Sequence, residues 1–328
     1  MNAASLPQLN EERDTLRPPE EFWGPVVLRD SAGQLRDAVE PQAIPHDIIK
    51  PTACPICAET NHPSLGIIYG YPIYHCLGCD AGFAWPQSDA DKLKAFYGPR
   101  YWANYLQDSR TIYERPELCK PIYARQADWL DRLLKHQYDS RILDVGAGDG
   151  TMLRLMKDRG YRDVYGLDLD ARNCQRAREQ LGVPVEHNDF LSYPQKGWDV
   201  ITLWAVIEHL TDPAAFVAQA YRLLKPGGKL VIMTGDNASA CARLQGCFDM
   251  WLYPPEHLFY FGKKSLTKLL QQHHFQQVGV RVGFQHPVKE TILSARRMLT
   301  AVKDRYFNKT PPRWRSTASN LLVAWGTK

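Results

Sequence analysis

A glycine-rich turn between an apolar run and a helical pattern constrains the fold of this chain more than any other feature. The motif DVGAGDG occupies residues 144–150, directly after Ile142 and Leu143 and before an amphipathic segment. Glycine permits positive φ angles and a close approach of the backbone to a ligand. Strand, glycine turn and helix N-terminus together therefore predict a ligand cradle.

The spacing within this turn indicates which ligand the cradle holds. A dinucleotide-binding turn reads G-x-G-x-x-G and places a pyrophosphate on the helix. Here Gly146 and Gly148 belong to G-x-G-x-G, and Asp144 precedes them. An acid suits a cationic amino group better than a pyrophosphate. Asp168 follows the next apolar run, where its carboxylate can accept hydrogen bonds from both hydroxyls of a ribose. The pattern predicts an adenosine with a positively charged amino-acid tail.

Strand and helix patterns alternate from residue 140 onward, which predicts an α/β fold with a parallel sheet and right-handed crossovers. The strand patterns are RILDVGAG, VYGLDLD, WDVITLWAV and KLVIMTG, and the helical ones are TMLRLMKDRG, ARNCQRAREQLG and AAFVAQAYRLLKPGG. Two more strand patterns, FQQVGVRVGF and NLLVAWGTK, follow near the end. Between them lies a basic, amphipathic helical segment, about 286–316, which we interpret as an insertion.

Four cysteines form two closely spaced pairs ahead of this region. Cys54 and Cys57, and then Cys76 and Cys79, each enclose two residues. Two such pairs supply the four thiolates of a tetrahedral zinc site, and a site closed by four thiolates is structural rather than catalytic. A redox role for one pair is the alternative. The other four cysteines are scattered, which agrees with free thiols in a reducing compartment.

These patterns divide the chain into four parts. We expect an extension over residues 1–50, a zinc-binding module over 51–88, a helical linker or lid over 89–137, and a catalytic domain over 138–328. No run of 18 apolar residues is present, and the first residues lack the pattern of a signal peptide. The expected location is therefore the cytoplasm, and the sequence leaves a homodimer open.

Successive segments resemble the motifs of class I S-adenosylmethionine-dependent methyltransferases. They are LDVGAGDG, YGLDLD, EHNDFL, VIEHLTDP and LLKPGGKLVI. The resemblance implies a Rossmann-like fold with a mostly parallel seven-stranded sheet and S-adenosylmethionine as cofactor. It also implies roles for individual residues: the methionine part held by Asp144, Gly146 and Gly148, the ribose by Asp168, and the adenine lined by Leu169, Asp189 and Phe190.

A closer resemblance is to a bacterial subgroup of these enzymes with a cysteine module in front. The shared features are CPxC and CxxC, the stretch GFAWP, and the segment PPEHL at residues 254–258. Members of this subgroup commonly methylate small molecules, including sugars and secondary metabolites. The resemblance therefore implies a small-molecule acceptor.

Two histidines are candidates for removing a proton from that acceptor, because the unperturbed pKa of histidine is about 6.5. His209 follows the fourth predicted strand of the domain, and His257 follows the fifth. Glu208 is placed to orient them. Trp204 belongs to an aromatic group that shields a sulfonium from water or packs as a lid. The alternative is catalysis by alignment alone, with no protein base.

The expected reaction is methylation of a hydroxyl oxygen, with carbon of a sugar as the next candidate. The fourth strand lacks the (D/N)PPY motif of enzymes that methylate amide or base nitrogens. An RNA methyltransferase is the third candidate, because zinc modules precede some of these and residues 281–315 are basic. The net charge of +4 is too small to indicate nucleic acid by itself.

Overall fold

The computed structural model describes residues 51–68, 71–85, 116–238, 254, 256–283 and 321–328. The expected extension over 1–50, residues 89–115 of the expected linker, and the insertion at about 286–316 lie outside the described residues. Among the helices that are described, none combines the length and apolar character needed to cross a membrane.

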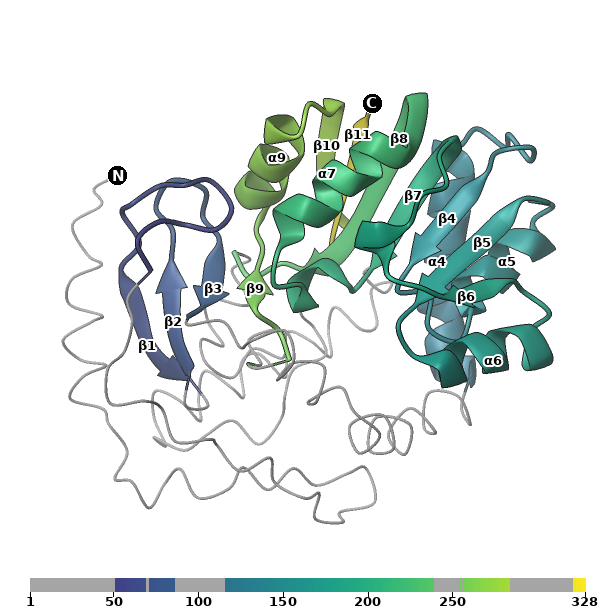
Figure 1. Ribbon diagram of the computed structural model, residues 1–328, viewed down its shortest axis with the longest axis horizontal. Helices are drawn as coiled ribbons and strands as arrows, with labels where there is room; N and C mark the ends of the chain where they lie inside the picture. The colour runs from purple at the N-terminus through teal and green to yellow at the C-terminus, as the bar shows by residue number, and fades with distance from the viewer. Residues whose placement is uncertain (1–50, 69–70, 86–115, 239–253, 255, 284–320) are drawn as a thin grey trace, which may run out of the picture.

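A seven-stranded sheet forms the centre of the molecule, with strand order β10-β11-β8-β7-β4-β5-β6 (Figure 1). All neighbours from β8 to β6 pair in parallel, and only β11 runs against the others. The prediction of a Rossmann-like, mostly parallel seven-stranded sheet is confirmed. The strands are β4 (Ile142–Val145), β5 (Val164–Asp168), β6 (Val185–His187), β7 (Trp198–Trp204), β8 (Leu224–Gly235), β10 (Gln276–Gly283) and β11 (Leu321–Thr327).

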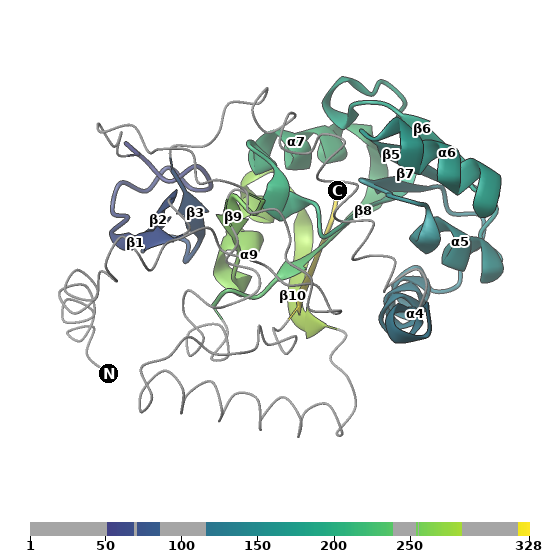
Figure 2. The ribbon, with the colours of Figure 1, turned by 90° about the horizontal axis from the view of Figure 1, so that it is seen from below.

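Helices cover both faces of this sheet, each over its own apolar core. On one face α4, α5 and α6 pack over a cluster that includes Leu153, Val200 and Val231. On the other face α7 and α9 pack over a cluster that includes Ile201 and Leu230. Figure 2 shows α4 and α7 on opposite sides of the strands. The helices are α4 (Pro116–Leu133), α5 (Thr151–Asp158), α6 (Ala171–Gln180), α7 (Pro213–Leu223) and α9 (Lys263–Gln272).

Short polar residues start the helices that follow the strands. Asp170 caps α6 by accepting from the Arg172 amide, and Asp212 caps α7 by accepting from the Ala215 amide. Pro213 occupies the first turn of α7, where its missing N–H costs nothing. These caps end the loops that follow β5 and β7 at the carboxyl edge of the sheet.

A second, antiparallel sheet holds the paired cysteines, with order β1-β2-β3-β9. Its first three strands, β1 (Ser64–Ile68), β2 (Tyr71–His75) and β3 (Gly82–Ala84), come from the cysteine region. The fourth, β9 (Phe259–Tyr260), comes from the segment after β8. Figure 1 shows β9 between β3 and the large sheet. The core around the cysteines is continuous with the core beneath α7 and α9.

The sequence patterns located most, but not all, of these elements. The predicted helix that begins near residue 214 ends at Leu223, five residues early, because β8 already begins at Leu224. Strand β6, helix α9 and strand β9 were not predicted from periodicity. β6 has three residues and β9 has two, which is too short for an alternating pattern to register.

Candidate active site

The glycine turn adopts the conformation that its sequence predicts. Gly146 and Gly148 have φ angles of 68° and 56°, in the left-handed region that disfavours side chains. A Cβ on Gly146 would lie 2.6 Å from Cγ2 of Val206, whereas a Cβ on Gly148 would meet no atom within 4 Å. Gly148 therefore borders open space in which a ligand can approach the backbone.

Asp168 closes this turn at the end of β5. One carboxylate oxygen accepts from the Gly148 amide and the other from the Asp170 amide, both at 2.8 Å. Each oxygen has a second lone pair, and the Asn173 side chain also lies near enough to favour the charged form of the carboxylate. Burial raises its pKa, although the two amides act in the opposite direction. Two hydroxyls of a ribose would satisfy these remaining lone pairs.

Asp144 is buried beneath the same turn. Its Oδ1 accepts from the Thr202 hydroxyl at 2.7 Å. Burial raises the pKa of Asp144 to about 7, and the nearby carboxylate of Asp168 adds to the rise. Two acids beside one cradle create a local negative potential, which favours a ligand that carries a positive charge.

The three residues assigned to the adenine by resemblance lie along the same edge of the sheet. Leu169 is 72% exposed directly after β5, which is unusual for a large apolar side chain. Asp189 is exposed, and its side chain accepts from the Leu191 amide at 3.0 Å. Phe190 is buried against Phe216, with ring centroids 5.4 Å apart. The Phe190 side chain thus belongs to the core behind the edge.

Glu208, His209 and His257 come together at the carboxyl edge of β7. A carboxylate oxygen and one nitrogen of each ring all lie within 4.8 Å of one another. The two imidazole rings meet edge to face with centroids 4.7 Å apart. The structure therefore unites three residues that the sequence had nominated separately.

Burial shifts the titration of two members of this cluster. It raises the pKa of Glu208 to about 8 and lowers the pKa of His209 to about 4, and the neighbouring His257 lowers the latter further. Among the described residues neither carboxylate oxygen of Glu208 makes a hydrogen bond, although the Thr234 hydroxyl is near enough to favour the charged form. At neutral pH the His209 ring is uncharged.

Backbone hydrogen bonds connect this cluster to the cysteine module. The Leu258 amide donates to the Glu208 carbonyl at 2.8 Å, and the Ala84 amide donates to the Leu258 carbonyl at 2.9 Å. The Tyr260 hydroxyl donates to the His257 carbonyl at 2.8 Å. His257 is thus held between the 3-10 turn Ile207–His209 and the antiparallel sheet of the cysteine module.

The four paired cysteines also converge. Their Sγ atoms all lie within 4.8 Å of one another, with 3.7 Å between Cys54 and Cys79 and 3.5 Å between Cys57 and Cys76. Two sulfurs bound to one tetrahedral zinc at about 2.3 Å are about 3.8 Å apart. The Ile56 amide faces the Cys54 sulfur at 3.4 Å. The donor set and its spacing fit a zinc ion.

Trp204 ends β7 at the same edge, paired in register with Met233 of β8. Helix α4 brings a polar residue there that the sequence patterns did not single out. The Gln126 amide nitrogen donates to the Met233 sulfur at 2.9 Å. The preceding residue, Arg125, has a buried guanidinium whose Nε and Nη2 find no hydrogen-bond partner in the part of the chain that the structure describes. An arginine within a helical pattern gives no sign of such burial, so periodicity passed over it.

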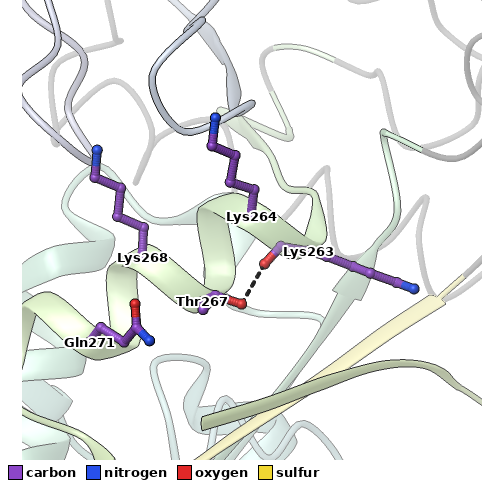
Figure 3. Close-up of a pocket in the computed structure, with 5 residues that line it drawn as sticks. All are labelled: Lys263, Lys264, Thr267, Lys268 and Gln271. Atoms are coloured by element: carbon purple, nitrogen blue, oxygen red, sulfur yellow. Dashed lines mark hydrogen bonds between the residues drawn. The ribbon is translucent and has the colours of Figure 1, made fainter.

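A separate hollow lies on the outer side of α9 (Figure 3). It is lined by Lys263, Lys264, Thr267, Lys268 and Gln271. The Lys264 and Lys268 side chains point the same way, and Lys263 points away from them. Because all five residues belong to one helix, this is a solvated basic face rather than an enclosed site.

Comparison of the sequence with known protein families finds a match to the family described as methyltransferase domain. The match covers residues 114–279, which is just over half of the chain. These residues include the glycine turn, Asp168 and the Glu208, His209 and His257 cluster.

Individual relatives of the chain are also named as methyltransferases. A ubiquinone biosynthesis O-methyltransferase of Bordetella avium is 30% identical over 45% of this chain and 61% of its own length. A probable S-adenosylmethionine-dependent methyltransferase of Mycolicibacterium smegmatis is 34% identical over 52% and 65%. The chain thus spans less than two thirds of either relative. One similar solved structure is a SAM-dependent methyltransferase of Thermotoga maritima, described as a possible histamine N-methyltransferase. It is 20% identical to this chain, and the superposition covers 70% of this chain and 96% of that one with a TM-score of 0.47.

Proposed function

Because the chain belongs to the methyltransferase domain family, we propose that it transfers the methyl group of S-adenosylmethionine to a hydroxyl oxygen of a small molecule. One observation carries this proposal. Gly146 of the cofactor turn packs against Val206, two residues before Glu208, so the turn and the cluster adjoin. The names of the O-methyltransferase relatives support oxygen as the accepting atom.

We assign the cofactor to the open side of the glycine turn. Asp168 accepts from the two ribose hydroxyls, and Leu169, Asp189 and the backbone of Phe190 bound the adenine. The methionine part lies at Gly146 and Gly148, with Asp144 favouring its amino group and Trp204 near its sulfonium. The buried guanidinium of Arg125 is the candidate partner for the methionine carboxylate, because arginine pairs with carboxylates through parallel hydrogen bonds.

S-adenosylmethionine supplies an electrophilic methyl group on a sulfonium. In the transfer, a bond forms from the acceptor oxygen to the methyl carbon and the carbon–sulfur bond breaks, leaving its electron pair on sulfur. The hydroxyl proton must leave as well. We assign the acceptor to the edge beside Glu208, His209 and His257, where these residues position the hydroxyl and promote loss of its proton.

We also propose that Cys54, Cys57, Cys76 and Cys79 hold one structural zinc ion. Four thiolates leave no open position on the metal, so its role is to fold the module. The module in turn supplies β3, the strand on which β9 pairs. Zinc thereby acts on catalysis through the position of His257.

The proposed activity is tested by following labelled methyl transfer from S-adenosylmethionine to polyhydroxylated small molecules and, in parallel, to RNA. We expect an O-methylated small molecule, and we expect His257→Ala to lower kcat by about a hundredfold or more while the Kd for the cofactor is unchanged. His136→Ala, which changes an exposed histidine beyond α4, is the matched control. Transfer to RNA alone, or a full rate in the His257 variant, would contradict the proposal.

The affinity for S-adenosylmethionine should depend on pH through Asp144. Its pKa is about 7 in the free protein, and a nearby cationic amino group would lower it, so binding releases a proton. Affinity is therefore present above about pH 7 and declines below it, becoming about tenfold weaker at about pH 6 than at about pH 7.5. Calorimetric titration at both values measures this. In Asp144→Asn the dependence should vanish, and a constant Kd in the wild type would refute the assignment.

A further inference from the structure

Glu208, His209 and His257 carry the donor atoms of a metal site in addition to their place at the acceptor edge. The three come from two segments that are far apart in the sequence, and their ligand atoms lie within 4.8 Å of one another. This spacing allows all three atoms to reach one ion.

The carboxylate of Glu208 is the strongest indication of a missing partner. The residue is 1% exposed, and within the described part of the chain neither oxygen has a hydrogen-bond partner. An ionised carboxylate taken out of water is strongly destabilising unless it is paired or coordinates a metal. No arginine or lysine forms an ion pair with Glu208 among the described residues, so a bound cation would supply the partner that the ionised carboxylate requires.

The imidazole of His209 is oriented as metal-binding imidazoles are. Its Nδ1 lies 2.8 Å from the Glu256 carbonyl oxygen. A carbonyl oxygen only accepts, so Nδ1 carries the proton and the lone pair is on Nε2. Metal-binding histidines characteristically donate their other ring N–H to a carbonyl or carboxylate in this way. The same bond fixes the ring against His257.

We propose that Glu208, His209 and His257 bind one divalent first-row transition-metal ion, which holds the acceptor hydroxyl. Two imidazoles and one carboxylate suit zinc, manganese, iron or cobalt, and three protein ligands leave coordination positions for substrate oxygen. A cation bound to a hydroxyl lowers its pKa, so the proton leaves to water before or during methyl transfer. This inference rests on the proposed function and specifies its substrates as molecules whose hydroxyl can coordinate a metal.

The test uses the full-length protein carrying one zinc ion per chain, held by the four cysteines, and Mn²⁺ as the probe. Manganese prefers oxygen and nitrogen ligands to thiolates, so the cysteine site does not compete for it. Electron paramagnetic resonance counts the Mn²⁺ removed from solution. We expect one ion per chain in the wild type, and in Glu208→Gln a Kd at least about a hundredfold higher, since even outer ligand partners contribute ten- to a hundredfold.

Glu256→Gln is the matched control, because it removes an equal charge beside the cluster while keeping the carbonyl that orients His209. Its Kd for Mn²⁺ should stay within about tenfold of the wild type. Glutamine has the shape of glutamate, so Glu208→Gln should fold, and its melting temperature should no longer rise with added Mn²⁺.

Each outcome separates this inference from the proposed function. No Mn²⁺ binding, or equal binding by Glu208→Gln, overturns the metal site even when methyl transfer proceeds. Mn²⁺ binding without methyl transfer to any hydroxyl supports the site and counts against the O-methyltransferase activity. S-adenosylmethionine binding, measured by calorimetry in each variant, should be unchanged, because neither substitution alters a residue assigned to the cofactor.

Discussion

Replacing Asp168 by alanine is expected to raise the Kd for S-adenosylmethionine by about a thousandfold. The carboxylate is held in place by the Gly148 and Asp170 amides, one on each oxygen, and faces the open side of the glycine turn. Two hydrogen bonds from ribose hydroxyls to a charged, largely buried acceptor contribute about 1.5–3 kcal/mol each, which corresponds to about a hundredfold to ten-thousandfold in total. Calorimetric titration of the cofactor and of its demethylated product measures the change.

Two further variants separate loss of recognition from loss of structure. Asp168→Asn keeps one accepting oxygen and should bind with intermediate affinity. Asp158→Ala removes a carboxylate that pairs with Arg154 on the exposed side of α5, and it should bind as the wild type does. If Asp168→Ala keeps its melting temperature and still binds the cofactor with wild-type affinity, the ribose is not held at Asp168.

Replacing Cys79 by alanine is expected to remove zinc and to abolish methyl transfer while the cofactor still binds. Cys79 is fully buried within the cluster of four sulfurs. Binding of a structural zinc contributes about 10–16 kcal/mol to folding in small zinc domains, so the module should unfold without it. β9 would then lose β3, and His257 its position, whereas the cofactor turn on β4 and β5 would remain.

Three measurements decide this prediction: zinc per chain by atomic absorption, proteolysis within residues 51–85, and calorimetric binding of S-adenosylmethionine. Cys174→Ala is the control for zinc, because Cys174 is buried on α6 away from the other thiols, and it should retain one ion per chain. A Cys79 variant that lacks zinc but methylates at the wild-type rate would show that the module does not position the acceptor side.

The sequence predicted those parts of the molecule whose causes are local. The glycine turn needs positive φ at Gly146 and Gly148, and only the residues themselves decide this. The alternation of strands and helices likewise shows in the apolar pattern. The path of residues 254–262 was not predicted, because the two residues of β9 have no periodicity and their partner strand lies far away in the sequence.

The candidate site shows the same division. His209 and His257 were predicted as candidates from their positions after strands. The contact between their two rings was not predicted. The burial of Glu208 depends on the Leu258 amide reaching back to its carbonyl, which is a tertiary interaction. The buried guanidinium of Arg125 depends on how α4 docks on the sheet. No pattern within one segment carries that information.

The pairing of β3 with β9 sets the order in which the chain can be completed during synthesis. The cysteine sheet gains its last strand only after residue 260 has left the ribosome, when most of the large sheet already exists. The cysteine sheet is therefore completed only after most strands of the large sheet have been synthesised. A catalytic half that begins at residue 116 would lack β3, and the buried rings of Phe259 and Phe261 would become exposed. An engineer who exchanges cysteine modules between relatives must therefore exchange residues 256–262 together with the module.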